Sequence, residues 1–118
     1  MQNKKDNDAK FALFDLHAQF CRVFADSKRL QILWLMKSGE RSVSEIAEAL
    51  GLSMSNVSQH LRIMRDRGAI RPRRDGRHVY YRIANQKFVE GSALVREGLL
   101  EELAKRGQAS DGGSDGYE

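Results

Sequence analysis

The stretch "VSEIAEALGLSMSNVSQHL", residues 43–61, contains two short apolar patterns separated by Gly51. The first pattern predicts a short helix that Ser42 or Ser44 begins and Gly51 ends, because serine caps helix N-termini and glycine ends helices. One stripe of this helix is apolar and is expected to be buried: Ile46, Ala47 and Leu50.

The second pattern predicts a helix with two different faces. Ser53 is its expected N-cap, and the helix continues to about Arg67. Apolar residues spaced by three and four predict a buried stripe: Met54, Val57, Leu61 and Met64. The other face has short polar and amide side chains followed by arginine: Ser55, Asn56, Ser58, Gln59 and Arg62. None of these gains by burial in a core, but Asn and Gln can make paired hydrogen bonds to adenine in DNA.

Two short helices joined by a turn with glycine predict a helix-turn-helix, in which the second helix enters the major groove of DNA. The residues that follow support this interpretation. The segment "AIRPRRDGRHVYYRI", residues 69–83, has β-prone runs on both sides of Asp75-Gly76, which favours a tight hairpin turn. Basic side chains surround the predicted tip: Arg73, Arg74, Arg77 and His78.

Positive charge is concentrated in this part of the chain. The whole chain of 118 residues has a net charge of +4. Residues 62–82 contain eight arginines and two acids, so this stretch has a charge of about +6. The remainder is slightly acidic, and the basic stretch is expected to contact a polyanion.

Three further helices are predicted outside this region. Residues 8–26 have a broad apolar face that includes Leu13, Leu16, Phe20 and Phe24. Ser27 is the expected cap of a second helix that packs Leu33 and Trp34 inward and ends before Gly39. The last helix is expected in "QKFVEGSALVREGLLEELAKR", residues 86–106.

The length suits one domain, over residues 8–106, with tails at 1–7 and 107–118 that lack enough apolar surface to order. One cysteine excludes a disulfide within the chain. The beginning of the sequence does not resemble a signal peptide, and no apolar run reaches the length of a membrane span, so we expect a cytoplasmic protein without membrane contact.

The segments "FADSKRLQIL", "VSEIAEALGLSMSNVSQHLRIMRDRGAI" and "RRDGRHVYYRI" resemble the ArsR/SmtB-type winged-helix repressors of bacteria. The resemblance covers residues 13–103. It implies a mainly α winged helix-turn-helix fold with about five helices and a two-stranded wing. It also implies a homodimeric, operator-binding repressor whose first and last helices form the dimer interface. The expected interface residues are Leu13, Leu16, Phe20, Leu94, Leu99 and Leu103.

A two-fold dimer would place its two recognition helices roughly 34 Å apart on DNA, so a pseudo-palindromic operator is expected. The expected base and nearby phosphate contacts are Ser53, Ser55, Asn56, Ser58 and Gln59. Arg62, Arg73, Arg74 and Arg77 are the expected phosphate clamps, and His78 joins them at the wing. His60 is expected to face DNA or to make a structural hydrogen bond.

The effector is not evident from the sequence. Metal-sensing members of the family resemble one another in a "CxC" pair near the third helix or an Asp/His set on the last helix, and this chain has neither. His17 and Cys21 are four residues apart on one helical face and could form a metal or redox site. The favoured interpretation is structural, with Cys21 buried and His17 at the edge of an interface. We therefore predict no metal, no cofactor and an unknown small effector.

No phosphate loop or catalytic constellation is present, so an enzyme is not expected. The remaining alternative is a winged-helix module that binds protein or RNA instead of a specific operator.

Overall fold

The computed structural model describes residues 4–110, with the side chains of residues 4–107. The chain forms two compact units, residues 1–85 and 86–118. The helices of the first unit are α1 (Lys4–Cys21), the short 3-10 helix η1 (Arg22–Phe24), α2 (Ser27–Leu35), α3 (Val43–Leu50) and α4 (Met54–Asp66). The described part of the second unit is the helix α5 (Gln86–Ser110).

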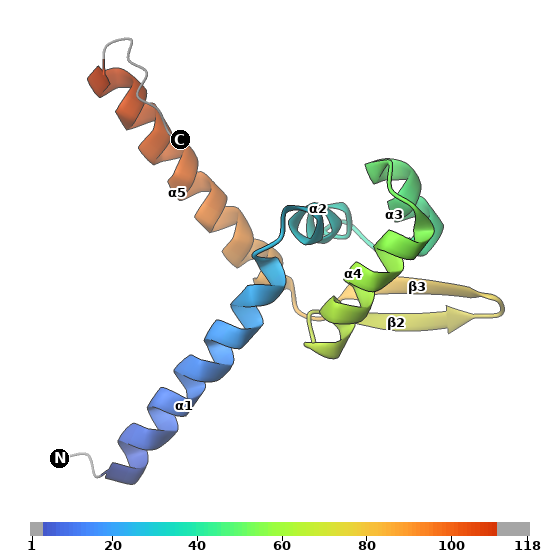
Figure 1. Ribbon diagram of the computed structural model, residues 1–118, viewed down its shortest axis with the longest axis horizontal. Coiled ribbons are helices and arrows are strands. Elements are labelled where there is room, and N and C mark those ends of the chain that lie inside the picture. The colour runs from blue at the N-terminus through green and yellow to red at the C-terminus, as the bar shows by residue number, and fades with distance from the viewer. Residues whose placement is uncertain (1–3, 111–118) are drawn as a thin grey trace. The chain divides into compact units, whose positions relative to one another are not determined.

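The first unit also contains a small antiparallel sheet with strands β1 (Arg41–Ser42), β2 (Ile70–Asp75) and β3 (His78–Ile83), in the order β1-β3-β2 (Figure 1). The hairpin of β2 and β3, residues 70–83, is called the wing below. Its pairing runs from Ile70 opposite Ile83 to Asp75 opposite His78, and Gly76 has the positive φ of 63° that the tight turn requires. The predicted hairpin is confirmed, and a two-residue third strand joins it.

The core lies among α2, α3, α4 and the start of the wing. The stripes predicted for α3 and α4 are buried at Ile46, Ala47, Val57, Leu61 and Met64. The rest of the core is Val23, Ile32, Leu33, Met36, Ala69 and Ile70. Because these elements bury residues against one another, they form the self-supporting part of the chain.

Several side chains differ from the sequence-based prediction, and one of them is Leu50 of α3, which is half-buried. The N-cap of α2 is Asp26, whose carboxylate accepts hydrogen bonds from the backbone N–H groups of Lys28 (2.8 Å) and Arg29 (3.1 Å), and Ser27 is the first residue of the helix. Trp34 is 45% exposed, with the Lys37 ammonium 3.6 Å from its ring centroid. Met54 is 53% exposed, and the first buried residue of α4 is Val57, three residues later.

Most large apolar side chains of α1 and α5 are exposed within the chain, and the predicted interface residue Phe20 is half-buried. Phe11, Leu13, Phe14 and Leu16 on α1 are 62–64% exposed, and no residue of α1 is buried. The large apolar side chains of α5 are also exposed: Leu94, Val95, Leu99, Leu100 and Leu103.

The helices extend into the predicted tails. Helix α1 begins at Lys4, and α5 continues to Ser110, so residues 4–7 and 107–110 are helical. The remainder of the two predicted tails lies outside the described residues. No helix in residues 4–110 is long and apolar enough to cross a membrane.

Candidate nucleic-acid interface

Both ends of α3 are capped by local sequence. The Ser42 side chain accepts a hydrogen bond from the Glu45 N–H (3.2 Å) and the Glu45 carboxylate accepts one from the Ser42 N–H (2.8 Å), which forms a capping box at the start of α3. This contact holds the pKa of Glu45 below its ordinary value. Gly51 ends the helix with a left-handed φ of 66°.

Helix α4 begins with a cap that uses one of the predicted contact residues. The hydroxyl of Ser53 accepts a hydrogen bond from the backbone N–H of Asn56 at 3.0 Å. The Ser53 hydroxyl therefore has a structural role as the cap, and the residue itself is exposed at the start of the helix.

The two faces of α4 separate as predicted. Val57, Leu61 and Met64 are at most 1% exposed. The predicted reading face is exposed: Ser55, Asn56, Ser58, Gln59 and Arg62. Among the described residues, these five side chains form no hydrogen bond to the rest of the protein. The helix thus offers a row of donors and acceptors that the fold itself does not use.

His60 lies between the two faces and is half-buried. Its Nδ1 is 3.4 Å from Nη1 of Arg29 on α2, and Arg29 also donates through Nε to the Val23 carbonyl at 2.6 Å. Since a guanidinium only donates, Nδ1 of His60 accepts, which in the neutral ring leaves the proton on Nε2. Arg29 also donates through its backbone N–H to the Asp26 carboxylate, and this hydrogen bond is the main reason that the pKa of Asp26 lies below its ordinary value. The structural alternative predicted for His60 is therefore present, as a contact that joins α4 to α2.

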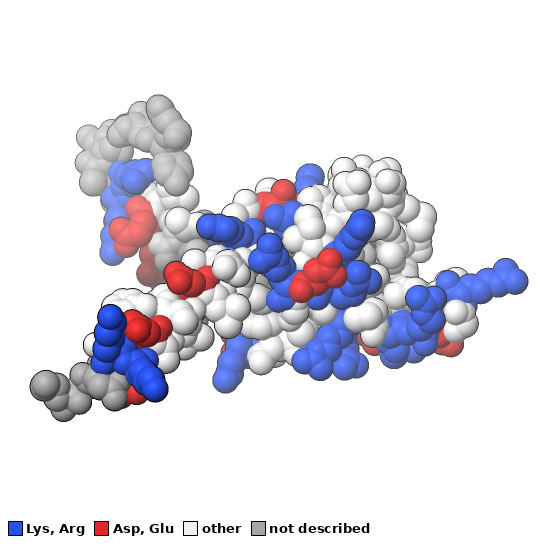
Figure 2. Space-filling model, turned by 60° about the horizontal axis from the view of Figure 1, so that its bottom comes forward, with Lys and Arg blue, Asp and Glu red and all other residues white. Residues whose placement is uncertain are grey.

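The wing presents basic side chains outside the core. Arg71, Arg74, Arg77, His78 and Arg82 are all exposed. Figure 2 shows Lys and Arg side chains gathered along this face and out to the tip of the wing. The sheet register places Arg74 with Val79 on one face, and Arg71 with Arg82 on the other. Both faces of the wing therefore have positive charge, and Arg77 in the turn belongs to neither.

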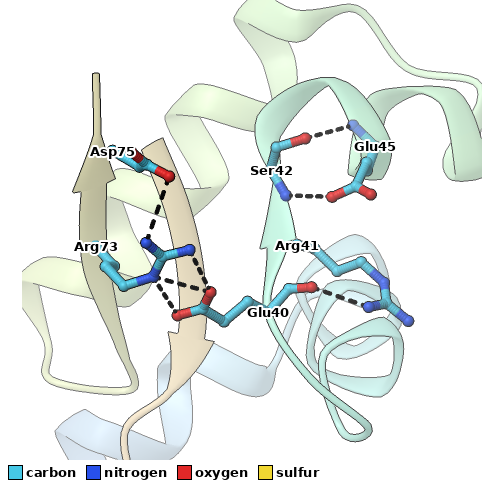
Figure 3. Close-up of polar contacts among 6 residues, drawn as sticks. All are labelled: Glu40, Arg41, Ser42, Glu45, Arg73 and Asp75. Atoms are coloured by element: carbon cyan, nitrogen blue, oxygen red, sulfur yellow. Dashed lines mark hydrogen bonds and ion pairs between the residues drawn. The ribbon is translucent and has the colours of Figure 1, made fainter. Parts of the chain in front are cut away.

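Arg73 differs from the other wing arginines because it is paired within the protein (Figure 3). Its Nε is 3.0 Å from both carboxylate oxygens of Glu40, and its Nη2 is 2.9 Å from Oε1 of the same residue. Nη1 is 3.9 Å from Asp75, and the guanidinium lies 4.9 Å from the ring centroid of Tyr80. Its expected availability as a phosphate clamp is thus reduced by an acidic partner 33 residues earlier in the chain.

The charges of this pair depend on each other. The hydrogen bond from Arg73 holds the pKa of Glu40 below its ordinary value, and the same bond raises the pKa of Arg73. A lowered carboxyl pKa means that Glu40 stays ionised at neutral pH and loses the pair only as the pH falls through that lowered pKa. The pair is therefore complete at the pH at which DNA binding would be measured.

His17 and Cys21 lie in the last two turns of α1, and both are exposed. Within residues 4–110, no group of three or more His, Cys, Asp and Glu side chains could hold a metal ion. The burial expected for Cys21 is not seen within one chain. Its favoured structural role, with no part in sensing, stays a prediction.

Sequence reasoning missed Arg29, Glu40 and the exposed position of Met54. Arg29 contacts a residue 31 positions away in the sequence, and Glu40 contacts one 33 positions away. No helical or strand period connects such pairs. The exposure of Met54 had a usable signal, since the first residue of a helix projects beyond the turn that it begins.

Known proteins resemble this chain over most of its length. Residues 26–71 match the family model described as bacterial regulatory protein, arsR family. The HTH-type transcriptional regulator Rv0324 of Mycobacterium tuberculosis is 39% identical over 98 residues, which are 83% of this chain and 43% of that protein. The chain thus spans less than half of that relative. The transcriptional repressor SmtB homolog of Synechocystis is 34% identical over 80% of this chain and 65% of its own length.

Two solved structures share the fold. The crystal structure of Rv0081 from M. tuberculosis has a TM-score of 0.73 and 37% identity, and the match covers 80% of this chain and 95% of that chain. The solution structure of the homodimeric winged helix-turn-helix DNA-binding domain of Mb0332 from Mycobacterium bovis has a TM-score of 0.74 and 36% identity, over 86% of this chain and 91% of that one. The chain therefore belongs to the arsR family of bacterial regulatory proteins, which are winged helix-turn-helix transcriptional regulators and not enzymes.

Proposed function

We propose that this chain is a homodimeric repressor that binds a pseudo-palindromic DNA operator in the bacterial cytoplasm and releases it in response to a small effector. The observation that carries the proposal is the exposed polar face of α4. Its amide and hydroxyl groups are not used by the fold and stand on the second helix of a helix-turn-helix. Such a helix enters the major groove with its N-terminal residues against the base edges.

Base contacts are assigned to the start and middle of α4. Asn56 and Gln59 have the amide groups that form two hydrogen bonds to one adenine, and Ser55 and Ser58 are short enough to approach base edges or phosphates. Ser53 contributes through its position at the helix start, since its hydroxyl is the cap. His60, held by Arg29, has Nε2–H as its remaining donor for a nearby phosphate.

Phosphate contacts are assigned to Arg62 on α4 and to Arg74, Arg77 and His78 on the wing. All four side chains are exposed. Wing residues beside the recognition helix can reach the sugar-phosphate backbone or the adjacent minor groove. These contacts supply affinity that falls with salt and does not depend on sequence.

The dimer is proposed from the exposed apolar side chains of α1 and α5. Leu13, Leu16, Leu99 and Leu103 are 41–64% exposed within one chain. Exposed apolar patches of this kind mark interaction sites. The homodimeric M. bovis relative supports a second copy of the chain as the partner. Two copies related by a two-fold axis would read two equivalent half-sites.

Within α5, the residues named from the sequence fall on two sides of the helix. Val95, Leu99 and Leu103 follow one line with a spacing of four. Leu94 is five residues from Leu99 and therefore about 140° around the helix. The first line is the stronger candidate for the dimer interface, because its members lie on one stripe.

The proposal is tested with the full chain and duplex DNA from its own upstream region. Fluorescence anisotropy against this DNA and against a shuffled duplex, across a salt series, should show preference for the upstream DNA and weaker binding at higher salt. Equal binding of both duplexes, or preference for RNA, would overturn the operator proposal in favour of a different winged-helix module. The same titration with metals, thiol oxidants and reduced sulfur species would identify the class of effector.

A further inference from the structure

The Glu40–Arg73 pair connects the wing to the helix-turn-helix. Strand β2 holds Arg73 opposite Tyr80 on β3, and β3 holds Tyr80 opposite Ser42 on β1. Cross-strand partners share one face of a sheet, so Arg73, Tyr80 and Ser42 form a row across the three strands. Glu40 is two residues before Ser42, and its carboxylate accepts hydrogen bonds from the Arg73 guanidinium, which lies over the Tyr80 ring.

The far end of the row is the start of α3. Ser42 is both the last residue of β1 and the N-cap of α3. Figure 3 shows Arg73 paired with Glu40, and the Ser42–Glu45 capping box a short distance further along the chain. A contact that restrains β2 at Arg73 therefore restrains the wing relative to the first helix of the helix-turn-helix.

The pairing also reduces the number of Arg73 hydrogen-bond donors that are available to a DNA phosphate. Three of its hydrogen-bond contacts go to one carboxylate, and Asp75 is near its remaining nitrogen. A DNA phosphate would have to displace Glu40 to obtain the same planar, two-pronged contact. Among the residues that the structure describes, the other wing arginines form no ion pair with a carboxylate: Arg71, Arg74, Arg77 and Arg82.

We infer that Arg73 is a positioning residue, and that the Glu40–Arg73 pair sets the direction of the wing so that Arg74 and Arg77 meet the DNA backbone. This inference rests on the proposed DNA binding. Both partners are substantially exposed, with side-chain exposures of 46% and 30%. Exposed ion pairs contribute little to folding stability, so the pair can be removed while the chain stays folded.

The sign of one substitution separates positioning from phosphate contact. If Glu40 only holds back a phosphate clamp, Glu40→Gln frees Arg73, removes a negative charge near DNA and tightens operator binding. If the pair positions the wing, Glu40→Gln weakens binding by roughly three- to tenfold, near the lower end of the coupling measured between contacting residues. The matched control is Glu48→Gln, which removes an exposed acidic charge from α3 without removing this pair.

Two double variants complete the test. Glu40→Gln with Arg73→Gln keeps the net charge of the wild type, so loss of affinity in this variant reports the missing pair and not the charge. Glu40→Arg with Arg73→Glu reverses the pair and is expected to recover most of the affinity, because the ion pair is restored. If Arg73 touches phosphate, a glutamate at that position is repelled by DNA, and the reversed variant binds more weakly than the neutral one.

The measurement is anisotropy of labelled operator duplex with each full-length variant, after circular dichroism confirms the helix content. Weaker binding by Glu40→Gln together with recovery in the reversed pair supports positioning. Tighter binding by Glu40→Gln, or no recovery, overturns it. The proposed function fails separately, because in that case the wild-type chain itself shows no preference for its operator.

A second inference follows from a different observation, the exposure of Met54. This is the first residue of α4, and it is 53% exposed next to the polar reading face. The N-terminal residues of a recognition helix contact base edges, and the apolar feature of the major groove is the methyl group of thymine. We infer that Met54 contacts a thymine methyl and makes one operator position specific for thymine.

The test removes each partner in turn. Thymines of the operator are replaced one at a time by deoxyuridine, which lacks only the methyl group, and each duplex is titrated with wild type and Met54→Ala. At one position the loss from deoxyuridine should vanish in Met54→Ala, which shows that the two groups interact. Ile63→Ala, which truncates a 41% exposed apolar residue near the other end of α4, is the control. Independent losses at every thymine would overturn the inference.

Discussion

Helices α4 and α1 differ in how they use apolar residues. Helix α4 buries Val57, Leu61 and Met64 against its own chain and leaves polar side chains outside. Helix α1 buries none of its residues, and four of its apolar side chains are exposed: Phe11, Leu13, Phe14 and Leu16. A short amphipathic helix gains most of its stability from packing. The comparison teaches that α4 is ordered by contacts within the chain, whereas α1, and α5 with it, need a partner surface.

The largest effect is expected from breaking the proposed partner surface. Leu99→Asp places a charge in the apolar line of α5, so the dimer should dissociate and apparent operator affinity should fall by about a hundredfold or more, because binding of the two half-sites is no longer linked. Light scattering reports the dimer and anisotropy the affinity. Glu97→Gln, on the polar side of the same helix, is the control. An intact Leu99→Asp dimer would remove this line of α5 from the interface.

The next largest effect is expected in the buried stripe of α4, the helix that packs within its own chain. Leu61→Ala empties a position that is 1% exposed and should lower the free energy of unfolding by about 2 to 5 kcal/mol, from lost burial and a residual cavity. Urea unfolding followed by circular dichroism measures this change. The matched exposed change, Ile63→Ala, should cost much less, and similar losses for both would contradict the assignment of the buried stripe.

Gln59→Ala tests whether the exposed face of α4 reads bases. We expect a loss of about 1 to 3 kcal/mol in discrimination at one base pair, because a paired hydrogen bond to the base is removed. The measurement is anisotropy on operators with single substitutions. Arg65→Ala, which removes a side chain paired with Asp66 at 3.2 Å, serves as the control. Equal losses on operator and shuffled DNA would exclude Gln59 from base readout.

A smaller and different effect is expected at the tip of the wing. Arg77→Ala should weaken binding to all sequences alike and reduce the slope of log affinity against log salt by about 0.9, the value for one phosphate contact. An unchanged slope would show that Arg77 does not touch the DNA backbone.

The smallest effect is expected for Cys21→Ser. The thiol is not used in the described part of the fold, so operator affinity and the response to effector should both stay unchanged. Release of operator by a thiol oxidant in the wild type but not in Cys21→Ser would instead make this residue the sensor.

The sequence predicts the helix-turn-helix and the wing well because their signals are local. Val57, Leu61 and Met64 recur with the helical period, and Asp75-Gly76 encodes a turn with positive φ. Where two cap-forming residues are adjacent, as at Asp26 and Ser27, local sequence does not decide which one caps the helix. Strand β1 has two residues, too few for a period to appear.

The functional residues divide in the same way. The exposed side chains of α4 follow directly from its helical period. The contacts of Arg73 with Glu40 and of His60 with Arg29 join residues that are distant in sequence, and the fold alone brings them together. Charge counting treated every wing arginine as equivalent, and the ion pair shows that Arg73 is not.

The most direct test of the central claim is an NMR titration of the isotope-labelled full chain with its operator duplex. We predict that the largest amide and side-chain shifts occur in residues 54–62 of α4 and 74–78 of the wing, while the resonances of α1 and α5 change little. Shifts confined to α1 and α5, with the side-chain amides of Asn56 and Gln59 unmoved, would contradict the account.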